Sequence, residues 1–432
     1  MNDREWLKKI KIKIVKLSPR KADVCVVVAS YNSVERITRF ISIMKTQTYK
    51  PDILVVDNSS NRNVINALKS VDINILSVEG LNVGTAGAFF IGQVLAMYMG
   101  YEWIINSDDD AYPSSSQFVE KLIGGTKKAK ALVGFGYQKK YGGLVEDDCL
   151  GCTAQLALIN CTVFEKIGFF EPKIWKIMED IEYRIRIERY GIKTVCVREA
   201  AYNHPISGQW SYGWPMKFLY YSFRNFLFVK QLYLKNMVGL FAFISTVIYA
   251  SISNYKLLKW YVKAFVDFLC SNYYFVDYDF PAELRYPSIL EKRKILDDER
   301  LNFVTLMGEK PLYLKNKPQL VPSSLITSIN KDVVFASGNF FNNLFLLFRS
   351  VYVYDCEMDE LYLIRKRTST LRDYAVFIIT VVISTFVFAL FSAYLLLSHF
   401  LFRKNAANQQ KQIKELSRYV LEQITTRSLV RR

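Results

Sequence analysis

The sequence predicts an α/β protein, because short apolar stretches alternate with amphipathic ones from Ala22 to Asp110. Four apolar stretches, ADVCVVVASYN, DILVVDNSSN, INILSVE and YEWIINSDDD, are rich in Val and Ile, and most of them end in polar residues. Such runs are typical of buried parallel strands. The stretches between them have helical spacing, and strands that alternate with helices predict right-handed βαβ units in one α/β sheet.

The later elements follow from the same patterns. LALINCTVFEKIGFF predicts a strand and a short helix, and MEDIEYRIRIERYG predicts a helix that ends at Gly191 before another strand. From Phe218 onward the pattern is helical and strongly aromatic, and VYVYDCEMDELYLI predicts a hairpin. The tail predicts an amphipathic helix that lies on a membrane or pairs with a copy of itself, with an apolar face formed by Ile413, Leu416, Val420 and Ile424.

Composition narrows the class of protein. The chain has 432 residues, of which 51% are hydrophobic, so it can bury a sizeable core and is not disordered. Its formal net charge of +17 indicates an anionic partner, either nucleic acid or anionic lipid. The seven cysteines show no disulfide framework, which is consistent with a reducing compartment.

A long charge-free run favours lipid over nucleic acid. No Asp, Glu, Lys or Arg occurs from Tyr374 to Phe402, and a helix of about 20 apolar residues spans a membrane. We therefore predict a transmembrane helix there, with the preceding body in the cytoplasm, because the N-terminus has no signal peptide. A second charge-free run, Asn236–Tyr255, is diluted by Asn, Ser and Gly, which favours a helix in the membrane interface.

Three adjacent aspartates, Asp108 to Asp110, follow the apolar stretch that ends the fourth predicted strand. Two like charges about 4 Å apart repel by roughly 4 kcal/mol at an effective dielectric constant near 20. A solvated turn tolerates this repulsion, whereas a cluster at a buried strand end usually holds a cation. Asn32 and Asp57 also end predicted strands, and the carboxyl ends of parallel strands meet at one edge of a sheet. We therefore favour a ligand or metal site.

Other residues have both a functional and an ordinary interpretation. His204 ends a predicted strand and either joins Asp108 and Asp110 on one metal or is a loop histidine. Glu179 and Asp180 open a helix, where carboxylates cap the N-terminus or act as a base for an acceptor hydroxyl. Tryptophans flank this region and either stack on a sugar ring or belong to the core: Trp175, Trp210 and Trp214.

The ordered motifs resemble the inverting family-two glycosyltransferases of the GT-A fold, most closely their galactofuranosyl- and rhamnosyltransferase-like branch. ASYN, KTQTYKPDILVVDNSS and LNVGTAGAFF are similar to that family's nucleotide-binding strands and donor loop. SDDDAYP is similar to its metal-binding motif, and GFFEPKIWKIMEDIEYRIRIERYG to its acceptor segment. YNHPISG and YYSFRNFLF are similar to its His motif and its Tyr-Tyr helix. Ala88 and Thr85 depart from the family's donor loop, so the donor sugar stays open.

The resemblance implies a Rossmann-like domain that transfers a sugar from a nucleotide diphosphate. It implies Mn²⁺ or Mg²⁺ on Asp108, Asp110 and His204, with Asp180 as general base and Glu179 beside it. It implies acceptor contacts from Trp175 and Trp210. The donor contacts that it implies come from Ser30, Asn32, Asp57, Ser59, Asn82, Gly84, Gly87 and Asp109.

The sequence thus predicts a membrane-anchored inverting glycosyltransferase with a UDP- or dTDP-linked donor and a lipid-linked or cell-surface glycan acceptor. It binds membrane lipid but not nucleic acid, and homo-oligomers are an open alternative. Two rival functions are a nucleotidyltransferase of similar fold and a non-catalytic membrane scaffold. The predicted parts are a basic segment (1–21), a GT-A domain (22–232), a membrane-associated region (233–372), a transmembrane helix (373–402) and a basic tail (403–432).

Overall fold

The computed structural model divides the chain into two units. The first comprises Met1–Pro205, Ser271–Asp277 and Lys404–Arg432, and the second comprises Ile206–Cys270 and Tyr278–Arg403. The structure describes residues 3–138, 155–204, 216–233, 256–276, 278–280 and 405–429, together with short strands within 303–363 and nine residues within 379–397.

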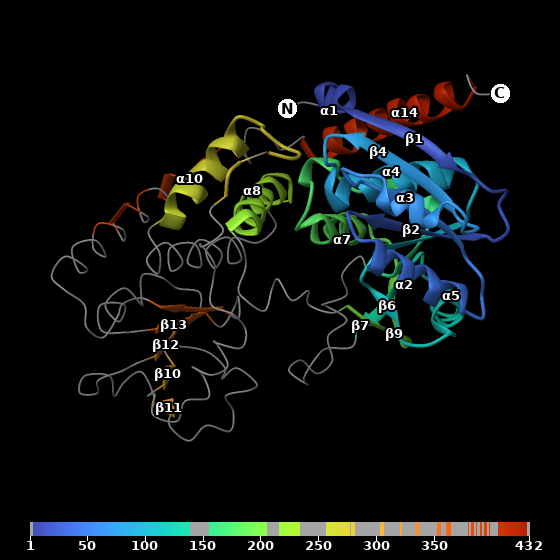
Figure 1. Ribbon diagram of the computed structural model, residues 1–432. Helices are drawn as coiled ribbons and strands as arrows, with labels where there is room; N and C mark the ends of the chain where they lie inside the picture. Colours follow the sequence, from blue (N-terminus) through green and yellow to red (C-terminus); the bar gives the residue numbers. More distant parts are fainter. Residues whose placement is uncertain are drawn as a thin grey trace. The chain divides into compact units, whose positions relative to one another are not determined.

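The first unit is built on a nine-stranded mixed sheet in the order β1-β4-β3-β2-β5-β8-β7-β9-β6 (Figure 1). Strands β2, β3, β4 and β5 are parallel, as the alternating sequence predicts. The strands are β1 (Ile10–Lys16), β2 (Val24–Ser30), β3 (Asp52–Asp57), β4 (Asn74–Gly80), β5 (Trp103–Asp108), β6 (Tyr112–Pro113), β7 (Val133–Gln138), β8 (Ala157–Asn160) and β9 (Thr194–Asn203).

Helices cover both faces of this sheet, and two separate apolar clusters fill the interfaces. One cluster contains the buried residues of α2, α3 and α5, and the other those of α4, α6 and α7. Alternate side chains of β2 belong to opposite clusters: Val27 to one, Val26 and Val28 to the other. The helices are α2 (Val34–Lys45), α3 (Asn63–Leu68), α4 (Gly84–Tyr98), α5 (Phe118–Lys128), α6 (Cys161–Ile167), the 3₁₀ helix η2 (Pro172–Ile174) and α7 (Glu179–Arg189).

The basic N-terminal segment belongs to this unit, which differs from the predicted division at residue 21. It forms α1 (Asp3–Lys9) and β1, and β1 pairs antiparallel with β4. The stretch IKIKIVK alternates apolar and basic residues, as an edge strand with one covered face does. Ile10 and Ile12 are buried, and lysines occupy the alternate positions.

The C-terminal tail also belongs to the first unit. Helix α14 (Asn405–Leu429) lies beside α1, β1 and α4 (Figure 1), and its predicted apolar face is buried in the cluster that contains α4. The chain's own domain therefore covers this face, in place of the membrane or second copy that the sequence predicted. Residues 271–276 join the same unit, where Tyr274 stacks on Trp6.

The second unit contains α8 (Met216–Tyr233) and α10 (Lys256–Leu269). The hydroxyl groups of Tyr220 and Tyr278 both donate to Asp267 within it. Its five-stranded sheet has the order β11-β10-β12-β13-β14, and the antiparallel pair β13–β14 confirms the predicted hairpin. The strands are β10 (Phe303–Thr305), β11 (Leu320–Val321), β12 (Val333–Ala336), β13 (Tyr352–Asp355) and β14 (Glu360–Leu363).

No helix among the described residues is both long and apolar enough to cross a membrane. The run Asn236–Tyr255 and most of Tyr374–Phe402, on which the membrane predictions depend, lie outside the described residues.

Candidate active site

The ends of three adjacent strands bring the predicted donor and metal residues together. In the register of the sheet, Ser30 at the end of β2 is opposite Asp57 at the end of β3. On the other side of β2, Ala29 is opposite Asp108 at the end of β5. The predicted convergence of these strand ends at one edge of the sheet is therefore confirmed.

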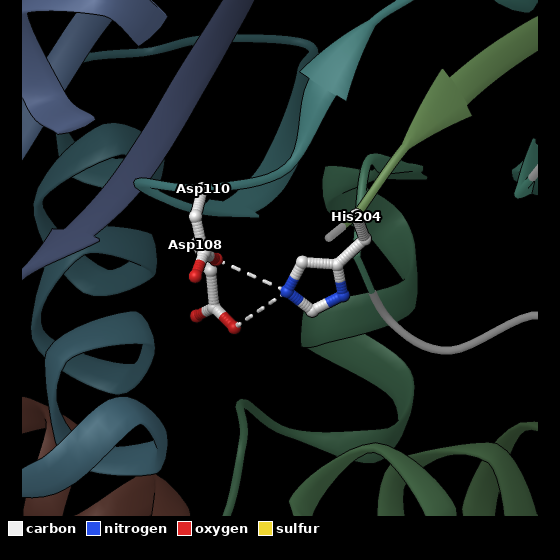
Figure 2. Close-up of side chains that lie close together, drawn as sticks. All are labelled: Asp108, Asp110 and His204. Carbon is white, nitrogen blue, oxygen red and sulfur yellow. Dashed lines mark hydrogen bonds and ion pairs between the residues drawn. The ribbon is translucent and has the colours of Figure 1, made fainter. Parts of the chain in front are cut away.

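Asp108, Asp110 and His204 form a compact cluster at this edge. One ligand atom from each residue lies within 4.8 Å of the other two. His204 Nε2 is 3.0 Å from Asp110 Oδ1 and 4.0 Å from Asp108 Oδ2, and the imidazole faces both carboxylates (Figure 2). Carboxylate oxygens suit Mg²⁺ and Mn²⁺, and one or two of them typically hold such an ion while phosphates complete its shell. The residues present thus fit a divalent cation.

Two residues that the sequence did not single out hold this cluster in place. Gln155 clamps Asp108, since its Nε2 donates to Asp108 Oδ2 at 2.9 Å and its Oε1 accepts from the Asp108 backbone N–H at 2.7 Å. Arg36, in the first turn of α2, donates from Nη1 to Asp110 Oδ2 at 3.1 Å. Neither residue lies in a recognisable motif, and only the folded sheet brings them to the aspartates.

The charges of the cluster are unevenly distributed. Burial, with Asp110 next to it, raises the pKa of Asp109 to about 7. Burial also acts to raise the pKa of Asp110, but the hydrogen bond from His204 and the charge of Arg36 outweigh it, so this pKa is lowered. For His204, burial opposes the charged form, yet Asp110 and Asp108 outweigh it and the pKa is raised. Asp110 is therefore the firmly ionised ligand, and the site favours a positive charge.

The carboxylate of Asp57 is buried and only half satisfied. Its Oδ1 accepts hydrogen bonds from the backbone N–H and the hydroxyl of Ser59, whereas its buried Oδ2 has no hydrogen-bond partner among the residues that the structure describes. Burial raises the pKa of this carboxyl. Asn32, at φ 52°, donates its backbone N–H to Ser59 Oγ at 2.8 Å, which joins the two strand ends. An unpaired buried oxygen is costly to the fold and marks a place for a donor group of a ligand.

The loop before α4 is fixed by a network around Asn82. Asn82 Oδ1 accepts from the Gly84 backbone N–H and from Asn58 Nδ2, both at 2.8 Å. Gly84 has φ 67°, and a Cβ atom there would lie 2.1 Å from the Trp175 carbonyl oxygen, so only glycine fits. At Gly87, an added Cβ would lie 2.7 Å from Val83 Cβ.

The structure describes one of the two tryptophans that were predicted to contact an acceptor. Trp175 is 5% exposed, and its indole N–H donates to the Asn82 carbonyl oxygen at 3.0 Å. It therefore braces the Asn82 loop, and its contact with an acceptor stays a prediction. Trp210 lies outside the described residues.

Glu179 and Asp180 are adjacent acids that begin α7. Glu179 is buried, and within the described part of the chain its Oε2 has no hydrogen-bond partner. Burial and the charge of Asp180 raise the pKa of Glu179 to about 8, and the charge of Asp108 adds to the effect. Burial also raises the pKa of Asp180, although its Oδ1 accepts from the Ile181 backbone N–H at 2.8 Å. With a pKa of about 8, Glu179 thus holds a proton at neutral pH.

The positive side chain of Lys176 acts electrostatically on both the acid pair and the Asp-Asp-His cluster. Burial raises the pKa of both Asp108 and Glu179, and the positive charge of Lys176 opposes this rise at each carboxyl group. Lys176 lies between two positive-φ residues, Trp175 and Ile177, in the connector that leads to α7. Lys176 is not recognisable from the sequence, since a single lysine in IWKIMED carries no motif.

A mixed α/β sheet with an acidic cluster at one edge is the arrangement of GT-A-like domains. Residues 25–151 match the family model described as glycosyl transferase family 2. Over 102 residues the chain is 28% identical to galactofuranosyltransferase GlfT1 of Mycolicibacterium smegmatis. The match spans 23% of this chain and 34%, about a third, of that relative's length.

Solved structures that parts of the chain match include a mannosyltransferase, PcManGT from Pyrobaculum calidifontis, in complex with GDP-Man and Mn²⁺. It is 16% identical with a TM-score of 0.37, and the match covers 52% of this chain and 67% of that one. Another is glucosyl-3-phosphoglycerate synthase from Mycobacterium tuberculosis in complex with Mn²⁺, UDP and phosphoglyceric acid. It is also 16% identical with a TM-score of 0.37, and the match covers 48% of this chain and 77% of that one.

Proposed function

We propose that this protein is a metal-dependent inverting glycosyltransferase that moves a sugar from a nucleoside-diphosphate donor to a hydroxyl group of a glycan or glycolipid. The observation that carries the proposal is that one unit holds an Asp-Asp-His cluster that fits a cation, a buried carboxylate oxygen without a partner among the described residues, and an adjacent pair of acids. Glycosyl transfer needs a group of each kind: one for the diphosphate, one for the nucleoside and one for the acceptor proton.

Asp108, Asp110 and His204 would hold Mn²⁺ or Mg²⁺. Bound there, the cation would stabilise the negative charge that develops on the departing diphosphate. Gln155 keeps the Asp108 carboxylate oriented for this task through two hydrogen bonds. The family match supports a nucleotide-sugar donor, and the Asp-Asp-His cluster supports the metal.

Asp57 would recognise the base of the donor. A uracil or thymine ring presents an imide N–H, and the unpaired Asp57 Oδ2 is a buried acceptor that lacks a donor. This complementarity supports a UDP- or dTDP-linked sugar. Ser59 and Asn32 hold the Asp57 side of the site, and the loop at Asn82 and Gly84 would lie beside the donor.

Asp180 would act as the general base. It takes the proton of the acceptor hydroxyl, whose oxygen then attacks the anomeric carbon from the face opposite the diphosphate. The bond from the anomeric carbon to the phosphate oxygen breaks, the nucleoside diphosphate leaves, and the configuration inverts. Glu179, protonated at neutral pH, donates a hydrogen bond to the acceptor.

The membrane location belongs to the same proposal. The run from Tyr374 to Phe402 has no charged residue, and its described residues are helical. They expose large apolar side chains, which is unfavourable in water and favourable in lipid: Ile379, Val382, Ile383, Phe386, Leu390 and Leu397. We therefore place the protein on the cell membrane with its catalytic unit in the cytoplasm, where a lipid-linked acceptor would be within reach.

Product analysis of the full-length protein tests this function. The purified protein is incubated with Mn²⁺ and UDP- or dTDP-linked sugars, and the released nucleotide is identified. Release of nucleoside diphosphate is expected, whereas release of pyrophosphate would identify a nucleotidyltransferase.

A variant of Asp180 tests the role of this residue as general base. Asp180→Asn should keep Mn²⁺ and nucleotide binding but lose transfer. The surface variant Asp72→Asn, which affects the exposed contacts with Lys21 and Ser18, serves as its control. Equal loss of nucleotide binding and transfer in Asp180→Asn would show a structural role.

A further inference from the structure

The C-terminal helix makes a buried polar contact with the catalytic unit. Gln409 in α14 is 4% exposed, and its Nε2 donates to Glu171 Oε2 at 2.7 Å. Glu171 is 1% exposed and precedes η2, where its Oε1 accepts from the Lys173 backbone N–H at 3.2 Å. A buried carboxylate is costly unless its oxygens are satisfied, so Gln409 and the start of η2 depend on each other.

A second set of contacts holds η2 in place through Lys173. Lys173 Nζ donates to Gln412 Oε1 at 3.1 Å and pairs with Asp3 at 3.2 Å. The Lys173 carbonyl accepts from the Tyr274 backbone N–H at 3.0 Å. Three segments far apart in the sequence, namely α1, residues 271–276 and α14, therefore meet on η2.

The other end of η2 leads directly into the candidate active site. Trp175 follows η2, and its indole N–H donates to the Asn82 carbonyl oxygen at 3.0 Å. Its own carbonyl accepts from the Ala86 backbone N–H at 3.1 Å. The loop that would lie beside the donor is thus held by the residue next to η2, from both its side chain and its backbone.

The connector from Trp175 to the acid pair has an unusual backbone. Trp175, Ile177 and Met178 have φ values of 62°, 68° and 76°, and none of them is glycine. Such residues are rare and persist only where the surroundings hold them. Since Glu179 follows Met178 directly, the position of η2 also sets where the acid pair begins.

We propose that Gln409 and Glu171 are positioning residues, through which the C-terminal helix holds η2 and thereby sets the donor loop and the acid pair of the active site. The inference rests on the glycosyltransferase function proposed above. The pair acts through Trp175, without touching the substrate. The tail is, on this proposal, part of the catalytic apparatus as well as a neighbour of the membrane segment.

A swap of the two side chains tests the contact. Gln409→Glu places two carboxylates face to face and should lower kcat at least about tenfold, because small displacements of reacting groups are costly. In the double variant Glu171→Gln/Gln409→Glu the amide and the carboxylate exchange places. The amide introduced before η2 then accepts from the Lys173 N–H and donates to the carboxylate introduced on α14, so kcat should return to near the wild-type value.

Gln410→Ala is the matched control on the same helix. Gln410 bonds to the Lys166 carbonyl and to the Tyr190 hydroxyl, at the ends of α6 and α7 and without contact to η2. It should leave kcat unchanged although it also removes contacts of α14. Equal loss of kcat in both single variants, or failure of the swap to restore it, would overturn the positioning role.

Hydrogen exchange separates this inference from the proposed function. In Gln409→Glu, the backbone amides of Gly84 and Ala86 should exchange faster than in the wild type and in Gln410→Ala. This readout does not need transferase activity, so an inactive wild-type protein would refute the function and leave the contact testable. Faster exchange confined to α14 would show that Gln409 only anchors the tail.

Discussion

His204 Nε2 lies 3.0 Å from Asp110 Oδ1, although 94 residues separate the two in the sequence. Strand β6 pairs with β9, so the residues that follow Asp110 run alongside those that precede His204. Because β9 is also part of the central sheet, the imidazole approaches the aspartates from a rigid element. The candidate metal site is thereby preformed by residues at the ends of two strands.

Loss of this imidazole should weaken metal binding strongly. We expect His204→Ala to lower Mn²⁺ affinity by more than the about 10- to 100-fold that loss of an outer-shell partner costs. A titration that follows free Mn²⁺ by electron paramagnetic resonance measures it. The chain's other histidine, His399, lies in the charge-free run and supplies the control His399→Ala. Equal affinities for the two variants would remove His204 from the ligand set.

Gln155 is expected to act as the outer-shell partner of the cluster. Gln155→Ala removes both hydrogen bonds to Asp108, so the carboxylate loses its fixed orientation. Mn²⁺ affinity should fall by about 10- to 100-fold. Gln138→Ala, at the end of β7, is the control. An unchanged affinity in Gln155→Ala would show that Asp108 is oriented by other contacts.

Arg36 should compete with the metal for the same carboxylates. Its Nη1 lies 3.1 Å from Asp110 Oδ2 and 4.0 Å from Asp109 Oδ1, so a bound divalent cation would face a like charge. Arg36→Ala is therefore expected to tighten Mn²⁺ binding in the absence of nucleotide. The matched control is Arg39→Ala on the same helix, whose guanidinium lies over the Tyr112 ring. Weaker binding in Arg36→Ala would show that Arg36 supports the site instead.

Much of the first unit could be predicted, because its strands and helices follow local patterns. The alternation of apolar and amphipathic stretches identified β2 to β5, and the rule that parallel strands end at one edge brought Asp57 and Asp108 together. The motif series then placed His204 with them. These inferences need only periodicity, strand polarity and residue chemistry.

What the sequence did not reveal depends on contacts between distant segments. Gln155 and Arg36 are ordinary polar residues whose partners lie 47 and 74 positions away. The apolar face of α14 was recognised as amphipathic, but periodicity shows that a face will be covered without showing by what. The indole of Trp175 looked like a stacking surface, whereas the positive-φ connector and Gly84 direct it into the Asn82 loop.

Glu179 should give the reaction an alkaline limit. Its pKa is raised to about 8, so the neutral form that donates to the acceptor is present below that pH and is lost above it. A profile of kcat/KM against pH should fall above about 8. Glu179→Gln keeps a neutral donor at every pH, so its profile should stay level there. A fall that persists in Glu179→Gln would assign the alkaline limit to another group.

Glu179 should also make the free energy of unfolding depend on pH, so that stability falls as the pH rises. An acid whose pKa is raised on folding binds its proton more tightly in the folded state. The folded state therefore loses stability as the pH rises from the ordinary glutamate value of 4.5 towards about 8. Urea unfolding should show that Glu179→Gln is more stable than the wild type at pH 9 and that the difference shrinks at pH 5. The opposite order would mean that the Glu179 carboxylate is stabilised within the fold.

The packing of α14 allows a prediction about the side of the membrane on which the C-terminal tail lies. Residues 271–276 and α14 both belong to the catalytic unit, so the chain between them must begin and end on the same side of a membrane. A single crossing by Tyr374–Phe402 would require a second crossing before it. The longest other charge-free stretch there, from Val333 to Phe348, is shorter than the about 20 residues a spanning helix needs, and it begins with strand β12. On the membrane location proposed above, the run Tyr374–Phe402 is thus expected to enter and leave the membrane at one face.

Labelling of introduced cysteines tests this expectation. In sealed vesicles, an impermeant maleimide should label Glu360→Cys and the exposed Tyr419→Cys from the same side, above the signal of the native cysteines. Labelling from opposite sides would establish a transmembrane crossing and show that α14 leaves the catalytic unit in the membrane.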